Sequence, residues 1–207
     1  MRGLWRLGLG VADSGVPSAG NLAVSVLAAH SMSLTDFGVF STLLLSLLMI
    51  VGLSRSLHGD VLVLTAARNA DEAAERTRGS LSSVLLCGAV VGPLSVAAGV
   101  ATVLWGADAS PWGPALIASG MVLPVLLLQD HHRWIAYSRG SIQDSVVNNT
   151  VWVLCSIAAT TAVVLTAETQ VTAAAGVLAW AWRRWGDWQW PPCEITSCRP
   201  CGTAPPG

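Results

Sequence analysis

Five long stretches of this chain contain no Asp, Glu, Lys or Arg, and they constrain its fold more than any other feature. They are residues 14–35, 37–54, 79–107, 109–129 and 145–167, with lengths of 22, 18, 29, 21 and 23 residues. A hydrocarbon core about 30 Å thick needs roughly 20 helical residues. Because lipid offers no partner for backbone N–H and C=O groups, we interpret each stretch as a transmembrane helix rather than a strand.

The composition supports this interpretation. Of the 207 residues, 53% are hydrophobic and 11% are charged, whereas soluble domains carry about 25% charged residues. A large soluble core could also contain apolar helices, but five such stretches in succession argue against that alternative. Every basic residue is an arginine, which suggests a GC-rich bacterial genome. The sequence therefore predicts a membrane protein.

The positions of the arginines predict the orientation of the helices. With a cytoplasmic N-terminus, the inside segments are 1–13, 55–78 and 130–144, and they hold all the arginines that precede residue 180. The outside turns hold none, as the positive-inside rule expects. A cleavable signal peptide is the alternative for the first stretch, but its apolar run starts late and carries Asn21 and His30. We expect an all-α, multi-pass protein of the bacterial plasma membrane, with five to six transmembrane helices.

The stretch 126–144, LLLQDHHRWIAYSRGSIQD, is the most polar interruption between these helices. We predict that it is the cytoplasmic connection between the fourth and fifth helices, with His131 and His132 solvated or at the level of the lipid headgroups. A metal site here would need further ligands, such as His58, to converge on the pair. No nucleophile, phosphate-loop, haem or zinc motif occurs in residues 1–168. The sequence thus predicts no metal, no cofactor, no catalytic residue and no enzyme activity.

Polar residues inside the predicted helices are the candidates for function. Asn21 and Ser25 lie four positions apart on one face of the first helix, and Asn149 lies at the start of the fifth. Intramembrane polar groups usually face a bundle interior or a water-filled path. The alternative is that they form hydrogen bonds between helices, and the sequence leaves both interpretations open.

Residues 13–40, DSGVPSAGNLAVSVLAAHSMSLTDFGVF, resemble the first two helices of polysaccharide-biosynthesis flippases. These flippases belong to the multidrug/oligosaccharidyl-lipid/polysaccharide exporter superfamily. The shared pattern is Asp–x–x–x–x–Ser–x–x–Asn, here at Asp13, Ser18 and Asn21, followed by Phe–Gly–x–Phe, here from Phe37 to Phe40.

Two further segments are similar to actinobacterial members of this family. Residues 54–64, SRSLHGDVLVL, resemble an Arg–x–Leu–x–Gly connection after the second helix. The stretch QDHHRW resembles the exit of the fourth helix, Gln–Asp–x–x–Arg–Tyr, with Trp134 in place of the tyrosine. The chain departs from the family pattern at Asn149, where an aspartate is usual, and at His30, where an arginine is expected. The resemblance covers about residues 10–180.

The resemblance implies one lobe of a transporter that flips lipid-linked saccharides, in which two six-helix lobes rock around a central cavity. The partners it implies are membrane lipids, a lipid-linked saccharide headgroup and a second lobe or a second copy of the chain, and not nucleic acid. The candidate cavity residues, as donors to sugar hydroxyls or phosphate, are Asn21, Ser25, His30, Arg55 and Asn149.

Three alternatives remain. One is a drug or cation antiporter of the same superfamily, which would use an intramembrane acid, and the five charge-free stretches contain none. The second is a non-transporting membrane scaffold or an inactive fragment. The third is a membrane-embedded transferase, which would need acids or a histidine base at the membrane face.

The last part of the chain has a different composition. We expect residues 1–175 to form the transmembrane bundle, and residues 176–207 to hold an incomplete sixth helix and a tail rich in Trp, Pro and Cys. An apolar helix encoded by GC-rich DNA gives such a composition when it is read out of frame. We therefore expect a frameshift or truncation near residue 180, or else a disordered tail, and no flippase activity from this chain by itself.

Overall fold

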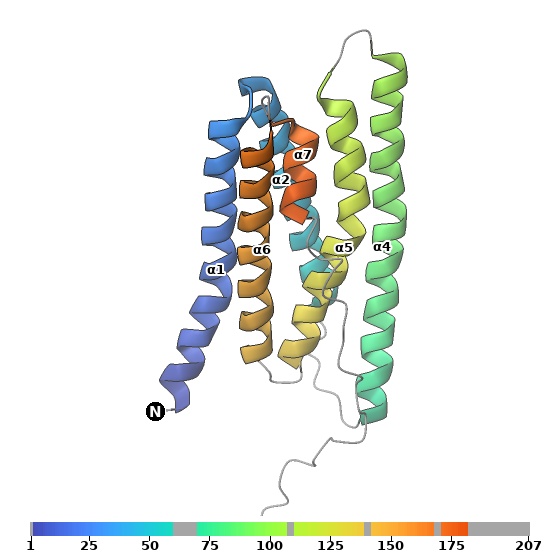
Figure 1. The fold of residues 1–207 in the computed structure, drawn as a ribbon. Helices are drawn as coiled ribbons and strands as arrows, with labels where there is room; N and C mark the ends of the chain where they lie inside the picture. The colour runs from blue at the N-terminus through green and yellow to red at the C-terminus, as the bar shows by residue number, and fades with distance from the viewer. Residues whose placement is uncertain (1, 60–69, 107–109, 139–141, 168–170, 182–207) are drawn as a thin grey trace, which may run out of the picture.

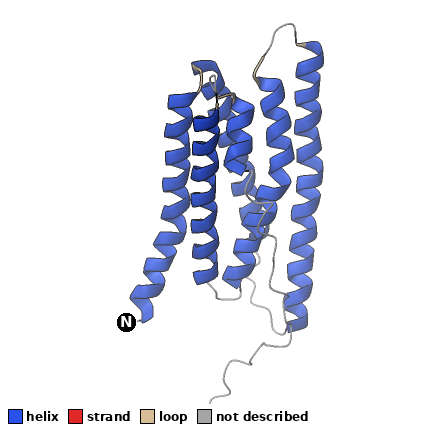
Figure 2. Ribbon diagram, in the orientation of Figure 1, coloured by secondary structure: helices blue, strands red, loops and turns tan. Residues whose placement is uncertain are grey.

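The chain folds into a bundle of helices (Figures 1 and 2). The computed structural model describes residues 2–59, 70–106, 110–138, 142–167 and 171–181, and no strand occurs among them. The predicted all-α class is therefore confirmed for this part of the chain. The elements are α1 (Arg2–Ser31), α2 (Leu34–Ser54), the π-helical turn η1 (Arg55–Gly59), α4 (Ala70–Trp105), α5 (Trp112–Ser138), α6 (Ile142–Thr166) and α7 (Ala173–Ala181).

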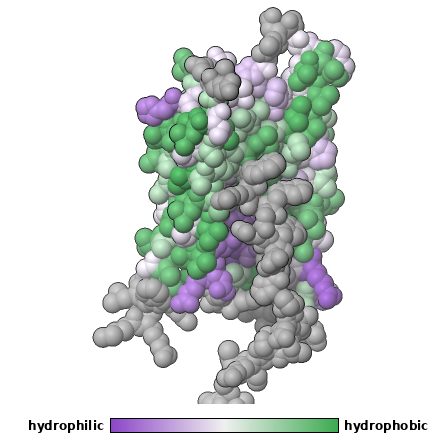
Figure 3. Space-filling view, viewed as in Figure 1, coloured by the Kyte–Doolittle hydropathy of each residue, from purple (hydrophilic) through white to green (hydrophobic). Residues whose placement is uncertain are grey.

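Four of the described segments are long and apolar enough to cross a membrane. They are Leu34–Gly59, Ala74–Trp105, Trp112–Ser138 and Ile142–Thr166. Hydrophobic residues also cover much of the described part of the face shown in Figure 3, and exposed apolar patches of this kind mark surfaces that contact a membrane or another protein. These features are those of a multi-pass membrane protein.

The first predicted helix differs from the other four. Residues 14–31 are helical as predicted, within the 30-residue α1, but α1 is not among the four candidate spans. Its sequence contains glycines and serines as well as Asp13, all of which lower its hydropathy. The five to six transmembrane helices expected from the sequence are thus reduced to four that qualify by length and composition within the described residues.

The turn between α1 and α2 lies earlier than predicted. Residues 14–35 were expected to form one span, but α1 ends at Ser31 and α2 begins at Leu34. Ser33 is the N-cap: its Oγ accepts the backbone N–H of Asp36 at 3.1 Å and donates to Asp36 Oδ2 at 2.6 Å. Serine caps a helix because its oxygen pairs with a backbone N–H that has no intrahelical partner.

The fourth predicted helix is longer than the sequence indicated. The charge-free stretch ends at Gln129, but α5 continues to Ser138. Residues 130–138 of the predicted connection 126–144 are therefore helical, and its cytoplasmic location stays a prediction. A charge-free stretch marks the apolar part of a helix and not its end, and residues such as arginine are good helix formers.

The helices form close pairs. In Figure 1, α1 runs beside α6, the second half of α4 lies against α5, and the short α7 is surrounded by α2, α5 and α6. Glycines allow the close approach of α4 and α5. A Cβ atom on Gly120 would lie 2.5 Å from the carbonyl oxygen of Gly92, and one on Gly99 would lie 2.7 Å from that of Gly113. Small residues have this role at helix interfaces in membranes.

The bundle extends past residue 175, the boundary that the sequence predicted. In α7, Trp180 is buried, its Nε1 donates to Asn21 Oδ1 of α1 at 3.4 Å, and its carbonyl accepts the Ser156 hydroxyl of α6 at 3.0 Å. Its ring also contacts that of Trp152 edge-on at 5.5 Å. Gly176 to Ala181 therefore pack as an integral helix. The predicted frameshift and tail fall largely on residues 182–207, which lie outside the described residues.

Candidate functional site

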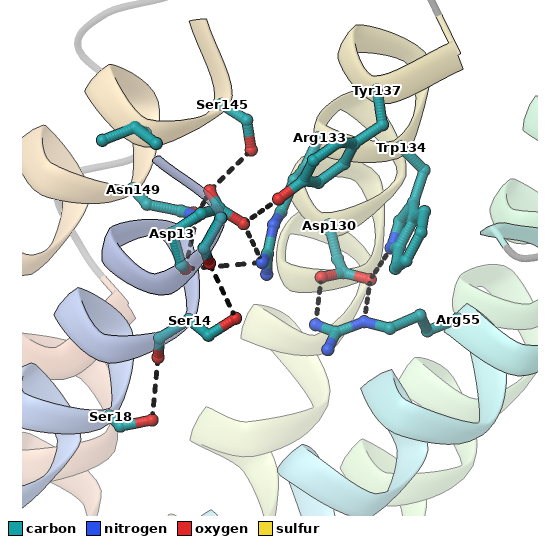
Figure 4. Close-up of polar contacts among 12 residues, drawn as sticks. Asp13, Ser14, Ser18, Arg55, Asp130, Arg133, Trp134, Tyr137, Ser145 and Asn149 are labelled. Carbon is teal, nitrogen blue, oxygen red and sulfur yellow. Dashed lines mark hydrogen bonds and ion pairs between the residues drawn. The ribbon is translucent and has the colours of Figure 1, made fainter. Parts of the chain in front are cut away.

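A carboxylate from α1 lies at the centre of the main polar site. Asp13 is 0% exposed, although its helix neighbour Ser14 is exposed. A charge removed from water is tolerated only where ion pairs and hydrogen bonds replace its hydration. Asp13 has both, as Figure 4 shows.

Two helices supply the partners of Asp13. From α5, Arg133 forms an ion pair with Asp13 Oδ2, and the Tyr137 hydroxyl donates to the same oxygen. From α6, the Ser145 hydroxyl donates to Oδ1 at 2.8 Å and Asn149 Nδ2 donates to Oδ1 at 2.7 Å. We call these five residues the Asp13 cluster. Both carboxylate oxygens of Asp13 accept hydrogen bonds. Within this cluster the positive charge of Arg133 balances the negative charge of Asp13.

Helical spacing explains why these side chains meet. Arg133 and Tyr137 are four positions apart on α5, and Ser145 and Asn149 are four positions apart on α6. Residues at this spacing share one face of a helix. The cluster uses the last turns of α5 and the first turns of α6. It therefore lies near the end of the bundle where the connection between α5 and α6 is made, as Figure 1 shows.

A second ion pair lies beside the cluster. Arg55 of η1 donates to both oxygens of Asp130 on α5, with Nη2 2.7 Å from Oδ1 and Nε 3.4 Å from Oδ2. Trp134 Nε1 also donates to Asp130 Oδ2 at 3.2 Å, and the Arg55 guanidinium lies 5.7 Å from the centre of the Trp134 ring. We call Arg55 and Asp130 the Arg55 pair. The Trp134 ring lies 5.5 Å from that of Tyr137 and so connects the pair to the Asp13 cluster.

The five candidates from the sequence do not form one site. Asn149 belongs to the Asp13 cluster and Arg55 belongs to the neighbouring pair. Asn21 accepts a hydrogen bond from α7, and the Ser25 hydroxyl donates to the backbone carbonyl of Asn21 at 2.8 Å. These contacts are hydrogen bonds between helices or within one helix, and such bonds are the alternative to a polar cavity for these two residues. His30 is exposed near the other end of α1, about 25 Å along the helix from Asp13 at 1.5 Å per residue.

Sequence reasoning missed most of the site. Asp13 was noted only as part of a motif, because it lies just outside the first charge-free stretch, and Arg133 was interpreted as a marker of orientation. Asp130 belongs to the QDHHRW segment but is not among the candidate cavity residues, and neither are Tyr137 and Ser145. The four-residue spacings on α5 and α6 were readable from the sequence. They did not, however, indicate that the two faces point toward the same acid on α1.

The interpretation of His131 as a solvated or headgroup-level side chain is wrong. His131 is 3% exposed, and its Nε2 has no hydrogen-bond partner among the described residues. It is buried because it continues the α5 face that carries Leu123 and Leu127, both of which belong to the apolar core. Within the described residues, no group of three or more His, Cys, Asp or Glu side chains could hold a metal ion.

Comparison with known proteins does not identify a family. No protein-family model, no curated protein and no solved structure matches this chain. The functional conclusion therefore depends on the site itself. Paired charges and amides of this kind can bind an anionic or hydroxylated headgroup or hold helices in one arrangement.

Proposed function

We propose that this chain is a helical lobe of a membrane transporter that moves lipid-linked saccharides. One observation carries the proposal: segments that resemble the exporter superfamily come together in the fold. Asp13 belongs to the first segment, Arg55 to the second, and Asp130 and Arg133 to the helix exit. Two ion pairs join these residues across helices. The arginine distribution already predicts that these segments lie at one end of the bundle, so it is the direct pairing of their side chains that supports the proposal.

The chemistry of the site supports a polar lipid headgroup as the ligand. Arg55 is the more accessible of the two paired arginines, with 36% of its side chain exposed against 13% for Arg133. A planar guanidinium suits phosphate oxygens. Trp134 and Asp130 hold Arg55 in place, so that it can bind a diphosphate at the mouth of the bundle with little loss of side-chain entropy. Meanwhile the lipid tail would remain against the apolar outer surface.

A binding experiment tests the proposal directly. The purified chain in lipid nanodiscs is incubated with a polyprenyl diphosphate that carries a fluorescent sugar, and the retained lipid is measured by native mass spectrometry. We expect retention above that of phosphatidylglycerol, and a clear loss of it in Arg55→Gln. Ser46→Ala is the control, because this exposed hydroxyl donates only to the carbonyl of Thr42 in its own helix.

Equal retention of the saccharide lipid and phosphatidylglycerol would contradict the proposal and favour a membrane scaffold. Equal retention by the parent and Arg55→Gln would leave a binding protein but remove Arg55 from its site. Transport itself is then measured in proteoliposomes, with the fluorescent sugar accessible to a membrane-impermeant quencher only on the outer face.

One observation favours cation-coupled transport as a second candidate. The charge-free stretches contain no acid, but Asp13 is fully buried against α5 and α6, and buried intramembrane acids commonly mark ion pathways. The ion pair with Arg133 weakens this reading, since a carrier carboxylate must be able to exchange its cation. Substrate efflux that requires a proton or sodium gradient in the parent, and not in Asp13→Asn, would favour the antiporter.

A further inference from the structure

One helix carries a residue of each ion pair. On α5, Asp130 pairs with Arg55 of η1, and Arg133 pairs with Asp13 of α1. These two α5 residues are three positions apart, so they are neighbours on the helix surface. Yet each is paired with a different element rather than with the other. In Figure 4, Arg133 extends between the two aspartates.

We propose that the bundle has a second conformation in which Asp130 and Arg133 pair with each other, so that α5 releases α1 and η1 together. The exchange needs side-chain rotation on one helix and no change in the fold of α5. It makes the contacts of α1 and η1 interdependent, although Asp13 and Arg55 do not touch. It does not depend on which substrate the protein carries.

Asp13 and Arg55 would each lose an ion-pair partner in the exchange, and each has another source of stabilisation. Asp13 would keep the two neutral donors of α6, Ser145 and Asn149. A carboxylate with such hydrogen bonds stays stable as an anion. Arg55 is partly exposed already, and water can hydrate its guanidinium as it leaves Asp130.

Arg133 gives an independent reason to expect a second arrangement. Its Nε is buried and has no acceptor among the described residues. Arginine has five N–H donors in a fixed fork, and a buried donor without a partner is destabilising. The present pairing therefore leaves part of Arg133 unsatisfied, and a carboxylate on its own helix offers it further acceptors.

The exchange would respond to ligands. Any group that neutralises Asp13 frees Arg133, and an anion that displaces Asp130 from Arg55 frees Asp130. Either event favours the internal α5 pair, because a ligand shifts an equilibrium toward the state that it binds better. The release of α1 from α5 and the release of η1 from α5 would then have the same cause.

Two double variants with the same change in charge test the exchange. Asp13→Asn with Arg55→Gln removes one acid and one base and leaves Asp130 and Arg133, which can pair on α5. Asp130→Asn with Arg133→Gln also removes one acid and one base but leaves Asp13 and Arg55 on separate elements. The thermal midpoint of each variant is measured in detergent, together with the four single variants.

We expect the first double variant to lose no more thermal stability than the more damaging of its two single variants. The second double variant should lose more thermal stability than the first, because it leaves Asp13 and Arg55 on separate elements without a charged partner. Additive losses in the first double variant would overturn the proposal, because they would show that Arg133 and Asp130 do not pair when their partners are absent.

Hydrogen exchange provides a second test that does not need Asp13 to be changed. In Arg55→Gln, Asp130 is free to take Arg133 from Asp13, so amides of α1 around Asp13 should exchange faster than in the parent. The control is Arg76→Gln, which breaks the Glu72–Arg76 pair within α4 and should leave α1 unaffected. Faster exchange in Arg55→Gln confined to η1 and α2 would overturn the proposal.

Discussion

Asn149 Nδ2 lies 2.7 Å from Asp13 Oδ1, so one hydrogen bond joins residues 136 positions apart. Asn149 also donates to the backbone carbonyl of Asp13 at 3.4 Å. This one side chain holds both the acid and its backbone against α6. An amide at this position can donate to a buried carboxylate, which an ionised acid could not do.

We predict that Asn149→Ala destabilises the protein. The change leaves Asp13 Oδ1 with the Ser145 hydroxyl as its remaining side-chain donor, and loss of a hydrogen bond to a buried charged group costs about 1–3 kcal/mol. The free energy of unfolding in mixed micelles is the measurement. Thr166→Ala on the same helix is the control, since this exposed hydroxyl bonds only to carbonyls of its own helix. Equal stability of the two variants would contradict the role given to Asn149.

Alanine should have opposite effects at two glycines of the α4–α5 pair. At Gly120 the added Cβ would lie 2.5 Å from the Gly92 carbonyl oxygen, and such overpacking costs about 1–3 kcal/mol. At Gly79 no atom lies within 4 Å of the added Cβ, and alanine in a helix is favoured over glycine by about 0.5–1 kcal/mol. Thermal unfolding of both variants measures the difference. A Gly120→Ala variant as stable as Gly79→Ala would refute the close contact of α4 and α5.

Trp180→Ala tests whether α7 is an integral part of the bundle. Trp180 is 3% exposed, and removing a buried tryptophan costs about 3–5 kcal/mol. Trp105→Ala is the matched control, because Trp105 is 81% exposed at the end of α4. Limited proteolysis and thermal unfolding should show a large loss for the first variant and a small one for the second. Similar losses would mean that α7 does not pack as described.

Cysteine labelling tests the predicted orientation. Single cysteines replace Arg78 and Ser110 in a background without the native cysteines, and a membrane-impermeant maleimide is added to intact cells. Because the arginine distribution places residues 55–78 inside, we expect labelling at position 110 in intact cells and at position 78 only after permeabilisation. Labelling of both positions in intact cells would contradict the orientation derived from the arginines.

The sequence by itself determined where most helices lie. Each charge-free stretch meets the length requirement of a membrane span without reference to any other part of the chain, because apolar transfer and backbone hydrogen bonding within a helix are local properties. This reasoning identified the cores of α2, α4, α5 and α6. It did not identify the end of a helix whose terminal turns carry charged residues, as in the last turns of α5.

Only the tertiary structure decided which polar residues form a site. Arg133 marks a cytoplasmic segment if it is read alone, and it becomes a buried partner only once α1 brings Asp13 to it. Likewise, Asn21 and Asn149 are both asparagines in apolar helices, but one bonds to Trp180 and the other to Asp13. The rotation and register of each helix against its neighbours select these partners. The rotation and the register depend on contacts between residues of different helices, such as Gly92 and Gly120. A local stretch of sequence does not contain this information.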